Sequence, residues 1–330
     1  MRNELAGDIS LAAGKSQYDA QCKRVLANRV ILAWILKYTV KEFENMSIPQ
    51  IKKCIGNDIQ ISKIRVSPGR TNAPQPEKII GEDGADKVPG EGEIYFDIRF
   101  SVFLPKKREK VKMIINVEAQ KDFYPGYAIP GRGVYYGARM ISAQKGTEFS
   151  GSNYDGIKKV YSIWICMNAP DHIGNAISEY SITKRDKIPG IPDVKAAYDK
   201  LSVVMICLNP RTGKGNRLTQ MLNILLSSEI KPERKIRKLE EEFHIPMEDG
   251  MGKELNQMCN LSDLVEEKGI QRGIQRGRKE LLVEMIEKKL KKGKSIHRIA
   301  DELEEDESVI RSMVEKIQKK EKGKIEDEQI

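Results

Sequence analysis

The sequence predicts an α/β fold, in which a mixed β-sheet is flanked by helices and followed by a helical C-terminal extension. Short apolar segments with alternating polar residues, typical of strands, recur through the first two thirds of the chain. Longer segments with apolar residues at helical spacing precede and separate these strands. From about residue 231 the sequence becomes charged and helical, which indicates the extension.

Two of the strand-like segments form a predicted antiparallel hairpin. They are Ile94–Phe100 and Met113–Gln120, and the polar segment Pro105–Lys110 between them is typical of a turn. A roughly symmetric hairpin about Lys107 places residues that are equidistant from it directly opposite each other. The hairpin is therefore expected to bring its two acidic residues together.

Asp97 and Glu118 are this pair, and opposed residues have Cβ atoms about 4.5–5.5 Å apart. Two like charges at that distance destabilise a sheet unless a cation lies between them. Oxygen donors alone suit Mg²⁺ or Mn²⁺. The alternative is that Asp97 faces solvent and simply pairs with Arg99 or Lys112.

The remaining core elements are predicted from their apolar patterns. A helix is expected over Gln17–Phe43, followed later by a central strand at Tyr161–Met167, an edge strand at Ser178–Thr183 and another strand at Leu201–Leu208. The core-facing stripe of the helix comprises Leu32, Ile35, Leu36, Thr39 and Phe43. Residues 64–93 are rich in Pro and Gly and indicate a loop, which is either a lid beside the site or an ordinary solvated insertion.

Composition limits the classes of function. The chain has 330 residues, 32% of them charged, and a net charge of +9, which suits a polyanionic partner such as DNA without proving one. No signal peptide is recognisable, and the longest apolar stretch, Val30–Leu36, is too short to span a membrane. We therefore expect a bacterial cytoplasmic protein with no membrane association and no small-molecule cofactor.

The cysteines and histidines form no recognisable zinc site or catalytic triad. The five cysteines have no paired spacing and are expected to be reduced and mostly buried, and the three histidines are expected at the surface. These residues are Cys22, Cys54, Cys166, Cys207 and Cys259, and His172, His244 and His297.

A run of motifs resembles a known nuclease family. Asp97, then Glu118-x-Gln120 after a hairpin, then a helix at Arg132–Gln144 and a strand at Val160–Cys166, is similar to the core of the PD-(D/E)XK nucleases. The order of these elements resembles the Rpn-type branch, the recombination-promoting nucleases often labelled PD-(D/E)XK family transposases. The resemblance extends from roughly residue 19 to residue 263, which is most of the chain.

The resemblance implies a restriction-endonuclease-like core and a metal-dependent DNA endonuclease that promotes recombination or transposition of a mobile element. It implies that Asp97, Glu118 and the backbone carbonyl of Ala119 hold Mg²⁺ or Mn²⁺. Gln120 stands where many members have Lys, and it would position the attacking water or a phosphate oxygen through hydrogen bonds. Phe96 precedes Asp97 where the family pattern has Pro. The alternative is a weakly active or inactive nuclease-derived DNA-binding or scaffold protein.

Several further residues are expected to contact DNA or complete the site. In the family, the helix after the Glu-x-Gln strand frames the cleft, and an N-terminal helix can add an acidic residue, for which Asp19 and Glu42 are the candidates. The alternative for the helix at Arg132–Gln144 is that Tyr135, Met140 and Ile141 pack the core and the arginines are solvated. The predicted DNA-binding residues are Arg99, Arg132, Tyr136, Arg139 and Gln144.

Three regions are expected along the chain: a nuclease-like domain at 1–228, a helical connector at 229–264, and a Gly-Arg repeat with a helical tail at 265–330. The repeat at 269–276 reads Gly-Ile-Gln-Arg twice and predicts a semi-flexible connector. Ser295 is expected to cap a helix at Ile296–Leu303, and Val309–Ile317 carries an apolar stripe. The two helices form either a DNA-docking helix-turn-helix or a small protein-interaction or dimerisation bundle, through which the chain would form a homodimer. The acidic segment Glu304–Glu307 favours the bundle.

Overall fold

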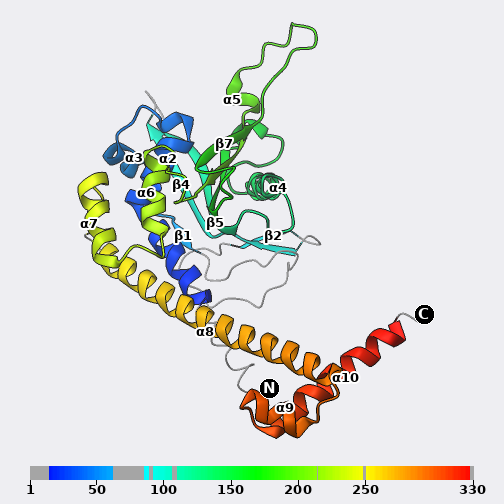
Figure 1. Ribbon diagram of the computed structural model, residues 1–330. Coiled ribbons are helices and arrows are strands. Elements are labelled where there is room, and N and C mark those ends of the chain that lie inside the picture. Colours follow the sequence, from blue (N-terminus) through cyan, green and yellow to red (C-terminus); the bar gives the residue numbers. More distant parts are fainter. Residues whose placement is uncertain are drawn as a thin grey trace. The chain divides into compact units, whose positions relative to one another are not determined.

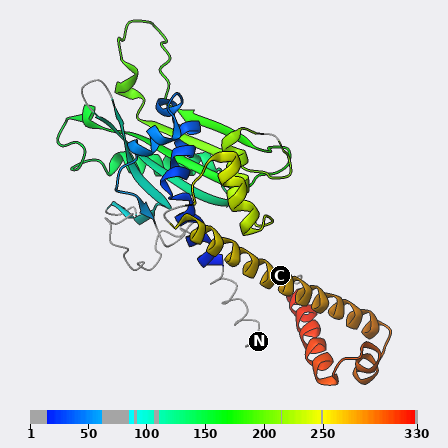
Figure 2. The same cartoon turned by 90° about the vertical axis from the view of Figure 1, so that its left-hand side faces the viewer.

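A computed structural model shows a six-stranded mixed sheet flanked by helices (Figures 1 and 2). It describes residues 15–61, 85–88, 92–105, 110–213, 215–247 and 250–327. Strands β5, β6 and β8 are parallel, whereas β1–β4, β4–β5 and β7–β8 pair antiparallel. The predicted α/β class and mixed sheet are therefore confirmed. In spatial order the strands are β1 (Gln60–Ile61), β4 (Ile98–Pro105), β5 (Lys110–Asp122), β6 (Lys159–Asn168), β8 (Leu201–Cys207) and β7 (Ala176–Ser181).

Helices pack against both faces of the sheet. The first helical segment covers residues 15–26. The others are α2 (Arg29–Thr39), η1 (Lys41–Phe43), α3 (Ile48–Cys54), α4 (Ile129–Ser142), η2 (Tyr154–Gly156), α5 (Lys195–Tyr198), α6 (Arg217–Leu226), α7 (Pro232–Phe243), α8 (Met251–Lys291), α9 (Ile296–Leu303) and α10 (Glu307–Asp327). The described helices include none that is long and apolar enough to cross a lipid bilayer.

Alternating residues of β5 belong to two core layers, one on each face of the sheet. Ile115 and Val117 belong to the larger layer, which they share with α2, α6 and α7, whereas Ile114 belongs to the layer beneath α4. Figure 1 shows α2 and α6 on one side of the sheet and α4 on the other. Since side chains alternate along a strand, Glu118 and Gln120 lie on the α4 side with Ile114.

The predicted Gln17–Phe43 helix is interrupted. Residues 27 and 28 form a turn, and Asn28 then caps α2 by accepting a hydrogen bond from the Val30 N–H at 2.9 Å. A side-chain acceptor at this position satisfies a free N–H of the new helix, so the break is stabilised locally. The predicted stripe is buried as expected, with each residue at most 7% exposed: Leu32, Ile35, Leu36, Thr39 and Phe43.

The strand predicted at Ile94–Phe100 is split in two. The chain bends at Phe96 and Asp97, between β3 (Gly92–Tyr95) and β4. Strand β3 pairs with β2 (Ala85–Val88) outside the main sheet. The expected long loop therefore contains a hairpin, and residues 64–84 and 89–91 of that loop lie outside the described residues. The later strands match their predictions, and β7 is an edge strand as expected.

Helix α4 lies close to the sheet because two glycines face it. A Cβ added to Gly133 would lie 2.5 Å from Val203 Cγ1 and 3.0 Å from Trp164 Nε1, and one added to Gly137 would lie 2.2 Å from Leu201 Cδ1. Such distances are below van der Waals contact, so side chains at these positions would push the helix away.

Gly133→Ala is therefore expected to lower the free energy of unfolding by up to about 2 kcal/mol. Overpacking costs about 1–3 kcal/mol, and the gain of alanine in helix propensity offsets roughly 1 kcal/mol of that cost. Gly131→Ala in the same helix is the matched control, because a Cβ there meets no atom within 4 Å. Chemical denaturation of both variants provides the measurement, and equal stability of the two would contradict the close packing.

The chain divides into two compact units, residues 1–263 and 264–330. The predicted connector at 229–264 is part of the first unit: Leu239 and Phe243 of α7 and Leu255 of α8 are all in its larger core layer. The second boundary, predicted at 264/265, lies one residue from this division. The five cysteines are all buried and unpaired, as predicted.

The Gly-Ile-Gln-Arg repeat is helical and does not form the predicted flexible connector. It lies inside α8, which continues without interruption from Met251 to Lys291. Ile270 and Ile274 are 57% and 66% exposed, so core packing does not hold this part of the helix. The strong helix formers on both sides offset the propensity cost of the glycines.

The second unit forms a small helical core of its own. Ser295 caps α9 by accepting a hydrogen bond from the Arg298 N–H, as predicted. The apolar stripe of α10 contributes Ile310, Val314 and Ile317 to this core, together with Ile286 of α8. These three residues of the stripe are thus covered by the same chain, whereas Val309 is 38% exposed, and the homodimer stays a prediction.

A chain that ends at residue 263 is expected to remain folded. Among the side chains that the structure describes, all those in the two core layers of the first unit come before that point. Its near-ultraviolet circular dichroism and its unfolding midpoint are expected to match those of the first unit in the full chain. An aggregated or molten product would show that residues 264–330 are required for the first unit to fold.

Candidate metal centre

Asp97 and Glu118 lie opposite each other at the end of the β4–β5 ladder. The ladder pairs Ile98 with Val117, so one step further places Asp97 opposite Glu118, as the hairpin symmetry predicted. The backbone N–H of Asp97 donates to Glu118 Oε1 at 3.0 Å, and the N–H of Ala119 donates to Asp97 Oδ2 at 3.0 Å. Both carboxylates are 5% exposed. These two backbone hydrogen bonds hold the buried acids side by side.

A lysine that sequence reasoning missed neutralises part of this charge. Lys23, in the helical segment 15–26, places Nζ 2.7 Å from Asp97 Oδ1 and 3.0 Å from Asp19 Oδ2. The residue is 0% exposed, and its ammonium makes these contacts as ion pairs rather than as well-aligned hydrogen bonds. Burial opposes its charge, but Asp97 and Asp19 outweigh that effect and raise the pKa of Lys23. Lys112, one of the two partners considered for Asp97, pairs instead with Glu148.

Glu118 is the acid with the least compensation. Burial raises its pKa well above the usual value, and the neighbouring Asp97 charge raises it further. The Asp97 N–H, Lys23 and Arg132 act in the opposite direction but do not cancel these effects. A buried carboxyl beside a like charge favours either a proton or a cation.

The structure distinguishes between the two candidates for an additional acid. Asp19 reaches the centre through its ion pair with Lys23. Glu42 instead accepts a hydrogen bond from the Tyr161 hydroxyl at 2.7 Å and lies 3.6 Å from Lys159. Both partners are at the start of β6, whereas Glu118 is paired in register with Trp164, further along that strand. Asp19 is therefore the candidate that we retain.

Gln120 and Asn116 share the α4-facing side of β5 with Glu118. Gln120 is 7% exposed, and its Nε2 donates to the Asp122 carbonyl at 3.1 Å. Asn116 is fully buried, and neither its Oδ1 nor its Nδ2 has a hydrogen-bond partner among the described residues. The sequence could have indicated Asn116, because a residue two positions before Glu118 on a strand lies on the same face. An unpartnered buried amide on the same strand face as Glu118 is suited to holding a water molecule.

Two of the predicted DNA-binding residues lie beside the acids. Arg132 donates to the hydroxyl of Tyr136 at 2.7 Å and to that of Tyr127, and its guanidinium stacks over the Trp164 ring at 5.3 Å. Arg132 and Tyr136 are both close enough to Glu118 to interact with it electrostatically. The arginine is half-buried, whereas Tyr136 is 3% exposed. Arg132 thus combines proximity to the acids with partial access to solvent.

The two remaining arginines of the prediction, Arg99 and Arg139, differ in exposure. Arg139 is 3% exposed, whereas Tyr135 is 47% exposed, so the alternative with a buried Tyr135 and solvated arginines is wrong at both positions. Arg99 is half-buried and lies 5.5 Å from the Phe96 ring centre. The role of Arg99 and Arg139 in DNA binding stays a prediction.

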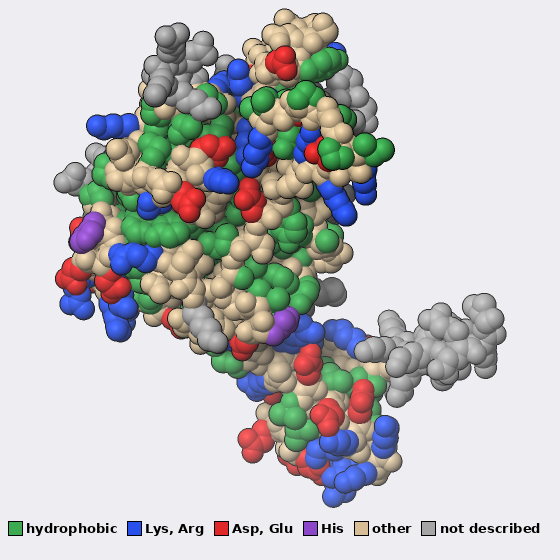
Figure 3. All heavy atoms as spheres, turned by 90° about the horizontal axis from the view of Figure 1, so that it is seen from above, with side chains coloured by type: hydrophobic (Ala, Val, Ile, Leu, Met, Phe, Trp, Pro, Cys, Tyr) green, Lys and Arg blue, Asp and Glu red, His purple; other side chains and the backbone are tan. Residues whose placement is uncertain are grey.

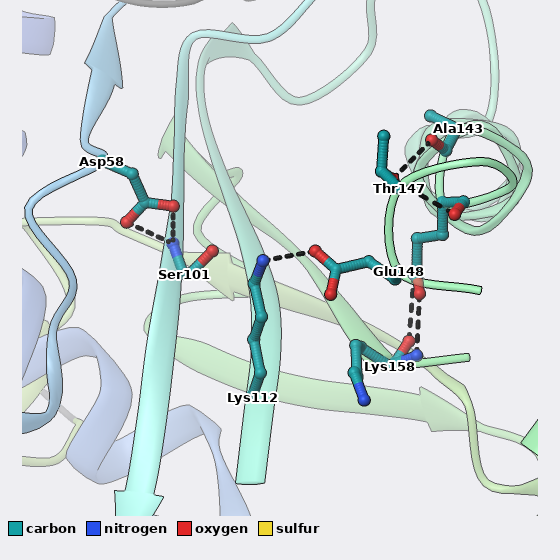
Figure 4. A network of polar contacts seen from close by, with 8 residues as sticks. Asp58, Ser101, Lys112, Ala143, Thr147, Glu148 and Lys158 are labelled. Carbon is teal, nitrogen blue, oxygen red and sulfur yellow. Dashed lines mark hydrogen bonds and ion pairs between the residues drawn. The ribbon is translucent and has the colours of Figure 1, made fainter. Parts of the chain in front are cut away.

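Gln144 has a structural role. It is 1% exposed, and its amide exchanges hydrogen bonds with the backbone of Lys158, at 3.0 Å to the carbonyl and 2.7 Å from the N–H. Figure 4 shows this region, with Thr147 bonded to Ala143 and Lys112 paired with Glu148. Because its amide is buried and bonded to the backbone of this loop, Gln144 is not part of the DNA-binding proposal.

The donor set fits Mg²⁺ in kind but is small. Mg²⁺ in proteins is often held by one or two carboxylates, with water and substrate phosphate completing its shell. Asp97 and Glu118 supply two such carboxylates. Among the described residues, however, no cluster of three or more His, Cys, Asp or Glu side chains could hold a metal ion. Lys23 also occupies Asp97 Oδ1, so a metal would bind beside an existing cation or in its place.

Comparisons with known proteins add no family assignment: no family model, curated protein or solved structure matches this chain. The functional argument therefore depends on the geometry of the site itself.

Proposed function

We propose that the protein is a Mg²⁺- or Mn²⁺-dependent DNA endonuclease of the PD-(D/E)XK type that promotes recombination or transposition. The observation that carries the proposal is the placement of the Asp97 and Glu118 carboxylates, each held by a backbone N–H of the opposite strand segment: Asp97 N–H donates to Glu118, and Ala119 N–H donates to Asp97. Holding two buried acids side by side costs free energy, which indicates a use for the pair. The resemblance of Asp97 and Glu118-x-Gln120 to that family supports the same function.

In this proposal Asp97, Glu118 and the carbonyl of Ala119 would hold the ion, which would supply a Lewis acid and lower the pKa of a bound water. Arg132 supplies a guanidinium next to the acids, and arginine binds phosphate by paired hydrogen bonds. Gln120 would turn its amide from the Asp122 carbonyl to the attacking water or to a phosphate oxygen. Asn116 would hold a water close to Glu118.

The charge of the protein is compatible with DNA but does not locate a binding surface. On the face that Figure 3 shows, basic and acidic side chains are interspersed rather than separated into one basic patch. The net charge of +9 therefore acts as a general attraction. Arg132 is the predicted DNA contact whose positive charge acts directly on Glu118.

Plasmid nicking tests the proposal. Supercoiled DNA is incubated with the purified protein, with and without Mg²⁺ or Mn²⁺, and nicked product is expected only with the metal. Glu118→Gln should remove it, because the amide keeps the shape of the side chain but is a weak ligand for a hard cation. Asp122→Asn is the matched control, since Asp122 is exposed on the same strand. Nicking that persists in Glu118→Gln, or without metal, would contradict the proposal.

A second candidate is a nuclease-derived DNA-binding or scaffold protein without catalysis. The specific observation in its favour is Lys23, whose ammonium compensates Asp97 so that no metal is needed for charge balance there. This protein would shift the mobility of DNA on a gel in EDTA and would nick no plasmid with any divalent ion.

A further inference from the structure

Lys23 is unusual among buried lysines in this protein. Lys235 is also 0% exposed, but its ammonium donates to the Ser227 carbonyl at 2.7 Å and contacts Cys259 Sγ at 3.2 Å. Lys23 instead reaches two carboxylates, and one of them belongs to the candidate metal centre. A buried ammonium needs compensation from hydrogen-bond acceptors or from opposite charges, and for Lys23 the two carboxylates supply it.

The two oxygens of Asp97 have different partners. Oδ2 accepts the hydrogen bond from the Ala119 N–H, which is part of the strand backbone and fixed in place. Oδ1 is paired with the ammonium of Lys23, which lies at the end of a flexible four-carbon side chain. A divalent ion that binds Asp97 through its less constrained oxygen would therefore meet the ammonium first.

Asp19 provides a second position for the same ammonium. It lies one helical turn before Lys23, an i,i+4 arrangement in which the two side chains are neighbours, and its side chain is 19% exposed. Lys23 can therefore release Asp97 without becoming an unpaired buried charge. The helical segment 15–26 carries both the cation and its alternative partner.

We propose that Lys23 is a tethered counter-ion that occupies Asp97 Oδ1 until a divalent cation displaces it toward Asp19. The inference rests on the proposed metal centre and adds a regulatory residue to it. The affinity of the site for metal is then set by exchange of one cation for another. Lys23 acts as a positioning residue, because it neither binds the metal nor touches the substrate.

Direct Mn²⁺ binding, followed by electron paramagnetic resonance of the free ion, tests this without any nuclease assay. Lys23→Met removes the competing charge and is expected to tighten Mn²⁺ binding at least about tenfold, since a nearby unit charge is strongly repelled in a poorly solvated site. Asp19→Asn removes the alternative partner and is expected to weaken binding. Lys235→Met is the matched control for loss of a buried lysine and should leave the affinity unchanged.

Lys23→Arg keeps the experiment decisive if the Met variant does not fold. A guanidinium binds a carboxylate more firmly through paired hydrogen bonds, so Mn²⁺ affinity should fall below that of the wild type. Equal affinities of wild type, Lys23→Met and Lys23→Arg would overturn the counter-ion role and leave the metal centre intact. Absence of Mn²⁺ binding in the wild type and every variant would instead remove the metal centre and, with it, the proposed function.

Discussion

Asp97→Ala is expected to lower the free energy of unfolding by about 3–5 kcal/mol, the usual cost of removing one partner of a buried ion pair. Asp97 Oδ1 is 2.7 Å from Lys23 Nζ, and Oδ2 accepts the Ala119 N–H. The variant therefore leaves a buried ammonium with Asp19 alone and a buried N–H without its acceptor. Sequence reasoning that considered only repulsion between Asp97 and Glu118 would predict a gain in stability. The ion pair with Lys23 reverses that sign.

Urea denaturation of the wild type and three variants measures this effect. Asp122→Ala at the end of β5 is the control, and an exposed substitution of this kind should change stability by less than about 0.5 kcal/mol. The double variant Asp97→Ala/Lys23→Met should recover much of the loss, because both buried charges are then gone. If Asp97→Ala is as stable as the control, Lys23 and Asp97 do not form a buried pair in the folded protein.

The opposition of Asp97 and Glu118 could be predicted because a hairpin has a simple geometry. Counting from the turn gives the register, and the ladder that pairs Ile98 with Val117 bears out that count. Counting from the turn could not predict the bend at Phe96 and Asp97, because the strand-like sequence pattern continues across these residues. Composition reports the preference for an extended backbone but does not show to which sheet the strand belongs.

Lys23 was missed for a different reason. Its partner Asp97 lies far along the chain, and a lysine in a charged N-terminal segment is normally solvated. Only packing of the helical segment 15–26 against the larger core layer, where Cys22, Val25 and Leu26 are buried, brings the ammonium to the acid. A single sequence gives no signal for such a long-range contact between two charges.

Helix α8 shows how propensity can be outweighed. Glycines at four-residue spacing weaken a helix, and they led to the expectation of a flexible connector. The flanking segments are strong helix formers, and pairs such as Arg276 with Glu280, at 2.9 Å, add i,i+4 support. A helix that is already nucleated on both sides continues through weak positions at a small cost. The four-residue repeat alone is too short to predict whether the chain is helical, because the flanking segments decide it.

Glu118→Gln is expected to raise the stability of the metal-free protein at neutral pH by about 0.5–2 kcal/mol, in contrast to Asp97→Ala. The amide oxygen can still accept the Asp97 N–H, while the buried charge is removed. Burial, followed by the charge of Asp97, raises the folded-state pKa of Glu118 above its ordinary value of 4.5. The folded state therefore holds the Glu118 proton more tightly than the unfolded state does.

The sign of the pH dependence follows from this difference in proton binding. Where the folded state binds more protons, the free energy of unfolding falls as the pH rises, here from about 4.5 up through the raised pKa of Glu118. Wild-type protein in EDTA should therefore lose stability over that range relative to Glu118→Gln, and the two should converge below it, where Glu118 is protonated in both states. Mg²⁺ at neutral pH should restore stability to the wild type and not to the variant, because a cation replaces the missing proton only where a carboxylate is present. Parallel stability curves for the two proteins across this pH range would show that Glu118 is not a strained buried acid, and the argument for a metal at Asp97 and Glu118 would lose its electrostatic basis.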